Sequence, residues 1–248
     1  MADAERRPNG LSLLFSMIDR PALALAEIAA RPKWRWVLPT ILLLATTTGS
    51  IVLSGPLTAE QTQKALQQQL ATLPAETAEM ARAQIDRLQQ PGFVLGMAIA
   101  GGLLGLALAW LLAAAILYFG MVVSGADLNF SALFATLPWL WLPFALRGVV
   151  QTGWMLYRGR LIANPGLSHL VSTGKPLEDA ANVVYGALSY VDLFVLWHLV
   201  LAFVLARTLP QFSRGKAFVL TLVYAAISLG LRLLPTLLGG SLLGRVIG

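Results

Sequence analysis

The sequence predicts an all-α, polytopic integral membrane protein with five transmembrane helices. Of its 248 residues, 57% are hydrophobic and only 12% are charged, which is about half the charged fraction of a typical soluble domain. The mean hydropathy is +0.70, so lipid must cover much of the surface. Five apolar windows can supply the ~20 residues that a spanning helix needs: about 36–54, 92–123, 133–157, 184–206 and 217–239.

Residues 1–35 precede the first window, and we expect a cytoplasmic segment with an interfacial helix ahead of the transmembrane domain of residues 36–248. A cleavable signal would place a short basic region directly before the apolar core, which this longer segment does not do. Asp19 can cap a helix, and Pro21 opens the run ALALAEIAA. An apolar stripe recurs at helical spacing: Leu11, Leu14, Phe15 and Ile18. This pattern predicts a helix that lies on the lipid headgroups.

Two basic segments border the apolar windows and are predicted to anchor the chain at the membrane interface. Tryptophan and cationic side chains are typical of that depth. The first segment is a collar before the first window: Arg31, Lys33, Trp34, Arg35 and Trp36. The second is a turn after the fourth window: Arg207, Arg214 and Lys216.

Residues 56–91 form the one sizeable polar segment and are predicted to be an exterior helical loop. Thr58 and Gln61 match a capping box, and Pro74 interrupts the segment. Apolar residues form a stripe on each side of Pro74: Leu66, Leu70 and Leu73, then Ala81, Ile85 and Leu88. The pattern predicts two short amphipathic helices. A charged recognition arm is the alternative, although the charges of the segment nearly cancel.

The second and third windows carry residues that affect helix packing. Gly101 and Gly105 form a Gly-x-x-x-Gly motif, which favours close packing inside the monomer, with a dimer face as the alternative. Pro138 and Pro143 each remove a helix hydrogen bond, so we expect a kinked or broken third helix.

The distribution of basic residues predicts the orientation in the membrane. Six precede the first window: Arg6, Arg7, Arg20, Arg31, Lys33 and Arg35. Five spans place this segment and the 207–216 turn on one side, which the positive-inside rule makes cytoplasmic. The bias is modest, because residues 158–183 also carry three cations on the predicted exterior side. We therefore expect a cytoplasmic amino terminus and an exterior carboxyl terminus.

Two stretches resemble the bacterial members of the Yip family, whose eukaryotic relatives are named for binding Ypt/Rab GTPases. The first, residues 192–222, has an acid before an aromatic pair, Asp192, Phe194 and Trp197, and later the turn Ser-Arg-Gly-Lys-Ala at 213–217. The second, PALALAEIAARPKWRWVLP at 21–39, is similar to the approach to the family's first span. The resemblance implies a five-helix integral membrane fold and the inner membrane of a bacterium.

The same resemblance implies no enzyme activity and no settled biochemical function, and we expect no cofactor. The Asp-Leu-Tyr/Gly-Pro signature of eukaryotic members has at best a remnant here, Asp127-Leu128-Asn129-Phe130. Rab-type GTPase binding is therefore not carried over to this chain.

Four ionisable residues fall inside the windows. Arg147, Asp192 and Arg232 lie at similar depth, in the outer half of the bilayer, and are predicted to form a charged cluster. The cluster is either a structural ion pair or a net positive site for an anion, unless the three residues do not meet. His198 is predicted to be neutral and bonded to another helix, with a proton relay as the alternative.

Catalytic and metal-binding motifs are absent from the sequence. Without cysteine, and with only His169 and His198, it offers no metal-ligand spacing. It also lacks phosphate-loop, nucleophile-elbow and zinc-protease motifs. The excess of basic residues, +6 in net charge, lies at the ends of apolar windows and suits anionic lipid rather than nucleic acid.

Three functions remain. The first is a non-enzymatic scaffold or partner-binding protein in membrane organisation or trafficking. Its contacts would be membrane lipids and either another protein or a second copy of the chain. The second is a small transporter, channel or lipid-handling protein that uses the charged cluster, and the third is an enzyme acting on lipid.

The predicted orientation can be tested with reporters in the living cell. A reporter fused at Gly10 is expected to read cytoplasmic, and one inserted near Ala75 is expected to read exterior, because the basic collar stays inside. Swapped readings would overturn the orientation and leave the five spans standing.

Overall fold

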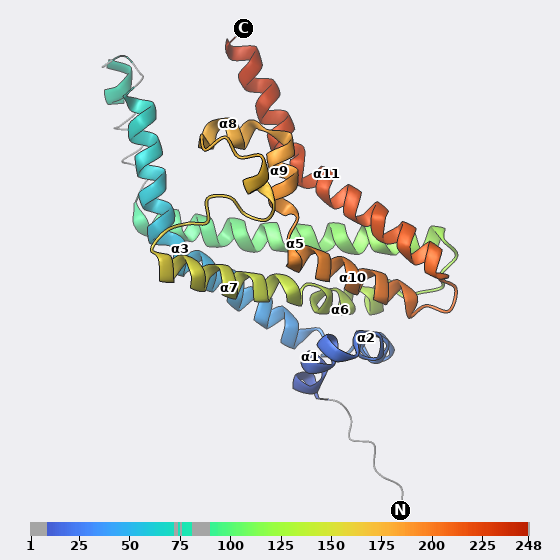
Figure 1. Cartoon of the computed structure of the whole chain (residues 1–248). Helices are drawn as coiled ribbons and strands as arrows, with labels where there is room; N and C mark the ends of the chain where they lie inside the picture. The colour runs from blue at the N-terminus through green and yellow to red at the C-terminus, as the bar shows by residue number, and fades with distance from the viewer. Residues whose placement is uncertain (1–8, 72–73, 75, 81–89, 248) are drawn as a thin grey trace, which may run out of the picture. The chain divides into compact units, whose positions relative to one another are not determined.

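The computed structural model describes residues 9–71, 74, 76–80 and 90–247, and the described chain is helical, without strands (Figure 1). Its longest helices are α3 (Val37–Leu70), α5 (Pro91–Val123) and α11 (Arg214–Ile247). The shorter elements are α1 (Gly10–Asp19), α2 (Pro21–Ala30), α6 (Phe130–Leu140), α7 (Leu142–Arg158), the 3₁₀ turn Ser168–Leu170, α8 (Pro176–Ala181), α9 (Val183–Tyr190) and α10 (Leu193–Arg207).

The helices confirm the predicted fold class, a polytopic helical membrane protein. Four segments are long and apolar enough to cross a bilayer: Val37–Gln68, Gly92–Val123, Phe130–Arg158 and Arg214–Leu234. The pair α9 and α10 together supplies a fifth candidate, bent by 66° between its two helices. Each of these segments overlaps one of the five apolar windows, and the first extends well beyond its window.

The first helix is longer than predicted, because α3 continues through Pro56 to Leu70. A separate helix starting at a Thr58–Gln61 capping box is therefore wrong: the Thr58 hydroxyl donates 3.1 Å back to the Ser54 carbonyl, inside the helix. One proline costs the helix a hydrogen bond, whereas the Ala, Glu, Gln, Lys and Leu residues that follow favour helix.

The break predicted near Pro74 is confirmed. The helix α3 ends at Leu70, Pro74 is not helical, and residues 76–80 are helical again. The second predicted stripe, Ala81, Ile85 and Leu88, lies outside the described residues.

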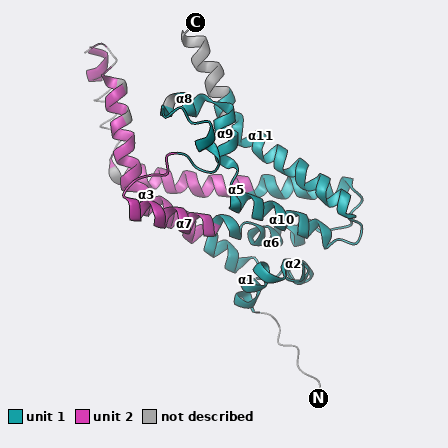
Figure 2. Cartoon of the chain, viewed as in Figure 1, with its two compact units in different colours: residues 1–43, 110–144, 164–248 teal, residues 44–109, 145–163 magenta. Residues whose placement is uncertain are grey.

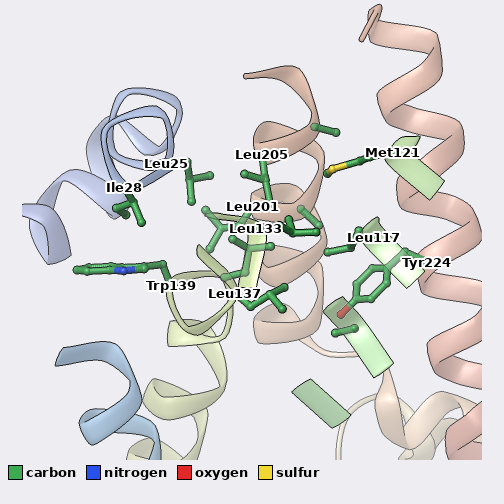
Figure 3. Packing of buried hydrophobic residues seen from close by; sticks show 14 of the residues in the cluster. Leu25, Ile28, Leu117, Met121, Leu133, Leu137, Trp139, Leu201, Leu205 and Tyr224 are labelled. Carbon is green, nitrogen blue, oxygen red and sulfur yellow. The ribbon is translucent and has the colours of Figure 1, made fainter. Parts of the chain in front are cut away.

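The chain divides into two compact units (Figure 2). The first comprises residues 1–43, 110–144 and 164–248, and the second comprises residues 44–109 and 145–163. The core of the first unit is a cluster of buried apolar side chains from α1, α2, α5, α6, α10 and α11. Figure 3 shows Leu25 and Ile28 of α2 on one side of this cluster, and Leu201 and Leu205 of α10 within it.

In the second unit, small residues let α3 approach its neighbours. A Cβ placed on Gly102 of α5 would come within 2.6 Å of the Ile51 side chain. On the other side, the Thr152 hydroxyl of α7 donates 2.9 Å to that of Ser50. A hydrogen bond of this kind between membrane helices contributes on the order of 1 kcal/mol.

The predicted role of the Gly-x-x-x-Gly motif inside the monomer is wrong. A Cβ at Gly101 or Gly105 would meet no described atom within 4 Å. Gly102, which lies between them, makes the close contact instead, because it is on the face of α5 that meets α3. The dimer alternative for the motif stays a prediction.

The third window is broken as predicted. The helix α6 ends at Leu140 and α7 starts at Leu142, so the break at Trp141 falls between Pro138 and Pro143. At the break, the Phe144 N–H donates 2.9 Å to the Trp141 carbonyl and not to Leu140 one residue earlier. The Leu140 carbonyl therefore loses its ordinary helical donor.

The fourth window is also broken, which the apolar pattern did not predict. A single helix over 184–206 is wrong, because α9 ends at Tyr190 and α10 begins at Leu193. The backbone of Asp192 is extended, with φ −146° and ψ 175°, and its carboxylate accepts 2.9 Å from the Val195 N–H. Asp192 thus acts as the N-cap of α10. Its carboxylate accepts a hydrogen bond from a first-turn N–H that would otherwise have no acceptor within the helix.

Gly166 allows its loop to pack closely against the end of α9. Its φ is +59°, and an added Cβ would lie 2.7–2.9 Å from the carbonyl oxygens of Val191, Leu188 and Ser189. The next residue, Leu167, donates its N–H 2.9 Å to the Leu188 carbonyl. The loop thereby adds a second donor to the Leu188 carbonyl, which also accepts 3.1 Å from the Val191 N–H.

We expect Gly166→Ala to destabilise the protein more than Gly174→Ala. Gly174 has a φ of +76° but no described atom within 4 Å of a Cβ. Its replacement should therefore lose only the ~1–2 kcal/mol of an L-residue in the left-handed region. Gly166→Ala adds overlap with three carbonyl oxygens, so roughly twice that loss or more is expected in unfolding measured in detergent micelles. Equal losses would show that the loop does not press on α9.

Candidate functional site

His198 lies at the break between α6 and α7 and pairs with the carbonyl that the break releases. The side chain is 1% exposed. Its Nδ1 lies 2.8 Å from the Leu140 carbonyl oxygen. Because a carbonyl only accepts, Nδ1 must carry a proton, which we assign from the geometry.

The other ring nitrogen of His198 faces α11. Nε2 lies 2.8 Å from the Tyr224 hydroxyl. In a neutral ring with Nδ1–H this nitrogen accepts, so the tyrosine donates. The prediction that His198 bonds to another helix is confirmed, and the contact involves two helices, α6 and α11.

Aromatic rings surround this hydrogen-bonded group. The Phe144 ring lies 4.8 Å from the imidazole, and the Trp141 ring lies edge-on to it at 6.0 Å. Tyr224 itself is 3% exposed. The site is therefore a buried junction of α6, α10 and α11, and its polar atoms hold helices together.

Arg35, predicted as an interfacial anchor, joins the amino-terminal helices to α6. Its guanidinium lies 2.8 Å from the Glu27 carboxylate of α2 and is only 15% exposed. Its backbone carbonyl accepts 3.1 Å from the indole N–H of Trp139, which is fully buried. The residue thus links α2 and α6 at once. Arg31 adds a longer, more exposed contact of 3.6 Å to Glu27.

The helices α1 and α2 form a hairpin with a buried inner face and an exposed outer face. Residues of the inner face, Met17, Leu25 and Ile28, are at most 1% exposed. The outer face carries large apolar side chains that are 62–73% exposed: Leu11, Phe15, Ile18 and Leu23. The predicted stripe therefore points outward, apart from Leu14, which is half-buried. An outward stripe is what an interfacial helix requires, and the interfacial position itself stays a prediction.

One detail of this hairpin differs from the prediction. Pro21 opens α2 as expected, but the N-cap is Arg20, which makes no side-chain capping bond. Asp19 belongs to the last turn of α1 and lies 3.7 Å from the Arg20 guanidinium. The cap assigned to Asp19 is therefore wrong, because Asp19 is the last residue of α1 and α2 has Arg20 as its N-cap.

Some of the remaining predicted anchors are exposed, and others form hydrogen bonds within the protein. Trp34 and Trp36 are 81% and 45% exposed. In the second basic segment, the Arg207 guanidinium bonds the Phe212 carbonyl, and the Lys216 ammonium lies 3.1 Å from the Ser124 carbonyl. Arg207 thus closes the turn between α10 and α11, and Lys216 links the start of α11 to the residue after α5, whereas Arg214 starts α11 and is exposed.

The predicted charged cluster falls on both compact units. Arg147 belongs to the second unit, and Asp192 and Arg232 belong to the first. Asp192 caps α10, and the Arg232 guanidinium lies over the Tyr190 ring at 5.0 Å from its centre. An ion pair of Asp192 with either arginine stays a prediction, as does the transporter or lipid-handling alternative that depends on it.

Sequence reasoning missed three polar side chains that the fold uses. In the sequence, Tyr224 looks like an ordinary residue of an apolar helix, and Glu27 looks like a solvent-exposed acid. Asp179, outside the spans, is 4% exposed. The Ser172 hydroxyl and the Thr173 N–H donate to its carboxylate and hold the pKa of Asp179 below its usual range. Its capping pattern, Ser-Thr before a Pro-led helix, was visible in the sequence.

The long apolar helices define a polytopic α-helical membrane protein. Among protein-family models, the Yip1 domain matches residues 15–234, and the chain belongs to the Yip1 domain family. This match contains both stretches on which the sequence resemblance was based. The search of curated proteins and that of solved structures each found no match.

The charged cluster can be separated from the capping role by two substitutions of Asp192. Asn caps a helix about as well as Asp, so Asp192→Asn preserves the cap and removes only the charge. If Asp192 pairs with a buried arginine, this variant should lose about 3–5 kcal/mol of unfolding free energy in detergent. A second change, Arg147→Ala or Arg232→Ala, should then partly restore stability.

The following stabilities would instead show that the charged cluster does not form. Asp192→Asn would be as stable as the parent, and Asp192→Ala would lose about 1 kcal/mol, the effect of a missing cap. Neither arginine substitution would then compensate, and the anion-site alternative would have no basis.

Proposed function

We propose that this chain is a non-enzymatic scaffold in the cytoplasmic membrane of a bacterium, with its amino terminus in the cytoplasm. On this proposal it binds a protein partner, or a second copy of itself, through the outer face of the α1–α2 hairpin, and so takes part in membrane organisation or trafficking. Membership of the Yip1 domain family supports a membrane protein of this type.

The observation that carries the proposal is the rigid attachment of the hairpin. The helix α2 packs against both α6 and α10, and Leu25 and Ile28 are fully buried there. The Glu27–Arg35 pair fastens the end of the hairpin. A helix that served only to hold the chain to lipid needs no such attachment, because its own apolar face suffices. A fixed apolar face is the kind of surface that specific partners recognise.

The spacing of the exposed side chains fits this interpretation. Leu11, Phe15 and Ile18 are separated by four and three residues on α1, so they lie in one row. Helices that bind in the groove of a partner use such i, i+4, i+7 anchors. The polar group of the helix junction supports a structural role, since both nitrogens of His198 hold helices together.

Site-specific photo-crosslinking in intact cells tests the proposal. A photoreactive residue at Phe15 should give a discrete protein adduct, which Ile18→Glu should reduce without lowering the amount of the protein. Ile18 is 69% exposed, so the charge should be tolerated by the fold. Val219 on α11, 59% exposed, is the matched position on a predicted span, where lipid adducts are expected.

Lipid adducts alone at Phe15, at the same level as at Val219, would contradict the proposal. The hairpin would then be an interfacial anchor and nothing more.

A further inference from the structure

An apolar groove of about 560 Å³ lies in the first unit, beside the collar. Its walls come from the link between α2 and α3, the first turns of α3, α5 and one face of α6. They include Pro32, Lys33, Trp36, Trp110, Phe134 and Pro138. The volume lies within the range of about 300–1,000 Å³ that small-molecule sites occupy.

The groove is elongated along α6. Phe130, Phe134 and Pro138 all line it, and their spacing of four residues places them on one side of the helix. Eight residues at about 1.5 Å each give a wall roughly 12 Å long. Both phenylalanines are exposed, at 40% and 42%. A linear apolar ligand fits this wall better than a compact one.

Lys33 is the one charged residue among the described residues that line the groove. Its side chain is exposed, and it forms no ion pair with any described residue. The nearby acid, Glu27, is already engaged by Arg35 and Arg31. An apolar groove with a free ammonium group at its edge is complementary to an amphiphile with an anionic head.

The ring of Trp110 also lines the groove and adds an apolar surface that suits an acyl chain.

A peptide is a poor occupant of this groove. Its backbone would bring N–H and carbonyl groups that each need a partner. Among the described residues of the wall, the only uncharged side-chain polar groups besides the indoles are the hydroxyls of Thr40 and Ser131. Thr40 already donates 2.7 Å to the Trp36 carbonyl. An acyl chain carries no such groups.

We propose that the groove binds an anionic glycerophospholipid of the surrounding bilayer. One acyl chain lies along α6 between Phe134 and Trp110, and the phosphate contacts Lys33. The groove is separate from the outer face of the α1–α2 hairpin, so lipid can occupy it whether or not that face binds a partner.

Photoactivatable lipids test the proposal on the full chain reconstituted in phosphatidylcholine vesicles. Trace phosphatidylglycerol or phosphatidylcholine with a diazirine in one acyl chain is added, and the labelled peptides are mapped by mass spectrometry. We expect phosphatidylglycerol to label residues 130–138 about five-fold more than phosphatidylcholine does, the preference that one lysine beside an anionic phosphate provides. Unlabelled phosphatidylglycerol should compete.

Three variants make the result specific. Lys33→Gln should reduce the labelling by phosphatidylglycerol to the level of phosphatidylcholine, and Arg214→Gln, an exposed cation that does not line the groove, should change nothing. Ala135→Trp should fill the groove and abolish labelling at 130–138 by both lipids. Labelling spread evenly over exposed apolar residues of α11, without competition or headgroup preference, would overturn the proposal.

Discussion

A helix broken inside a membrane must find new partners for the backbone groups that the break releases, and this constraint organises the first unit. No water is present at that depth, so each unpaired group costs several kcal/mol. The break at Trp141 releases the Leu140 carbonyl. His198 donates to that carbonyl and accepts from Tyr224. One imidazole therefore satisfies the break in α6–α7 and joins it to α10 and α11.

The second break follows the same rule with different groups. Between α9 and α10, the Asp192 carboxylate caps the new helix start, and the N–H of Leu167, next to Gly166, donates to the Leu188 carbonyl near the preceding helix end. The amino-terminal hairpin is attached to α6 as well, through Arg35 and Trp139. The helix α6 thus lines the apolar groove, contacts α2 of the hairpin and ends at the break that His198 bridges.

Composition and local pattern were sufficient to predict the fold class, the candidate spans and the proline-induced break, because each of these follows from hydropathy or from a missing N–H. The bend at Asp192 was not predictable in the same way. The apolar run continues across it, so an acid that caps a helix looks like an acid buried in a span. Pro56 shows the opposite error, since strong helix formers carry α3 through it. The contacts Glu27–Arg35 and His198–Tyr224 join residues whose proximity depends on the tertiary fold.

The central claim is that His198 is a neutral donor–acceptor bridge between a helix break and a neighbouring helix. ¹⁵N NMR of the protein in lipid bilayers, with the histidines labelled and His198 assigned through a His198→Gln variant, measures this directly. The account predicts a neutral ring with a proton on Nδ1 and an unprotonated Nε2, because the Leu140 carbonyl only accepts. A ring protonated on Nε2 alone, or an imidazolium, would contradict it, since neither arrangement bridges Leu140 and Tyr224 as described.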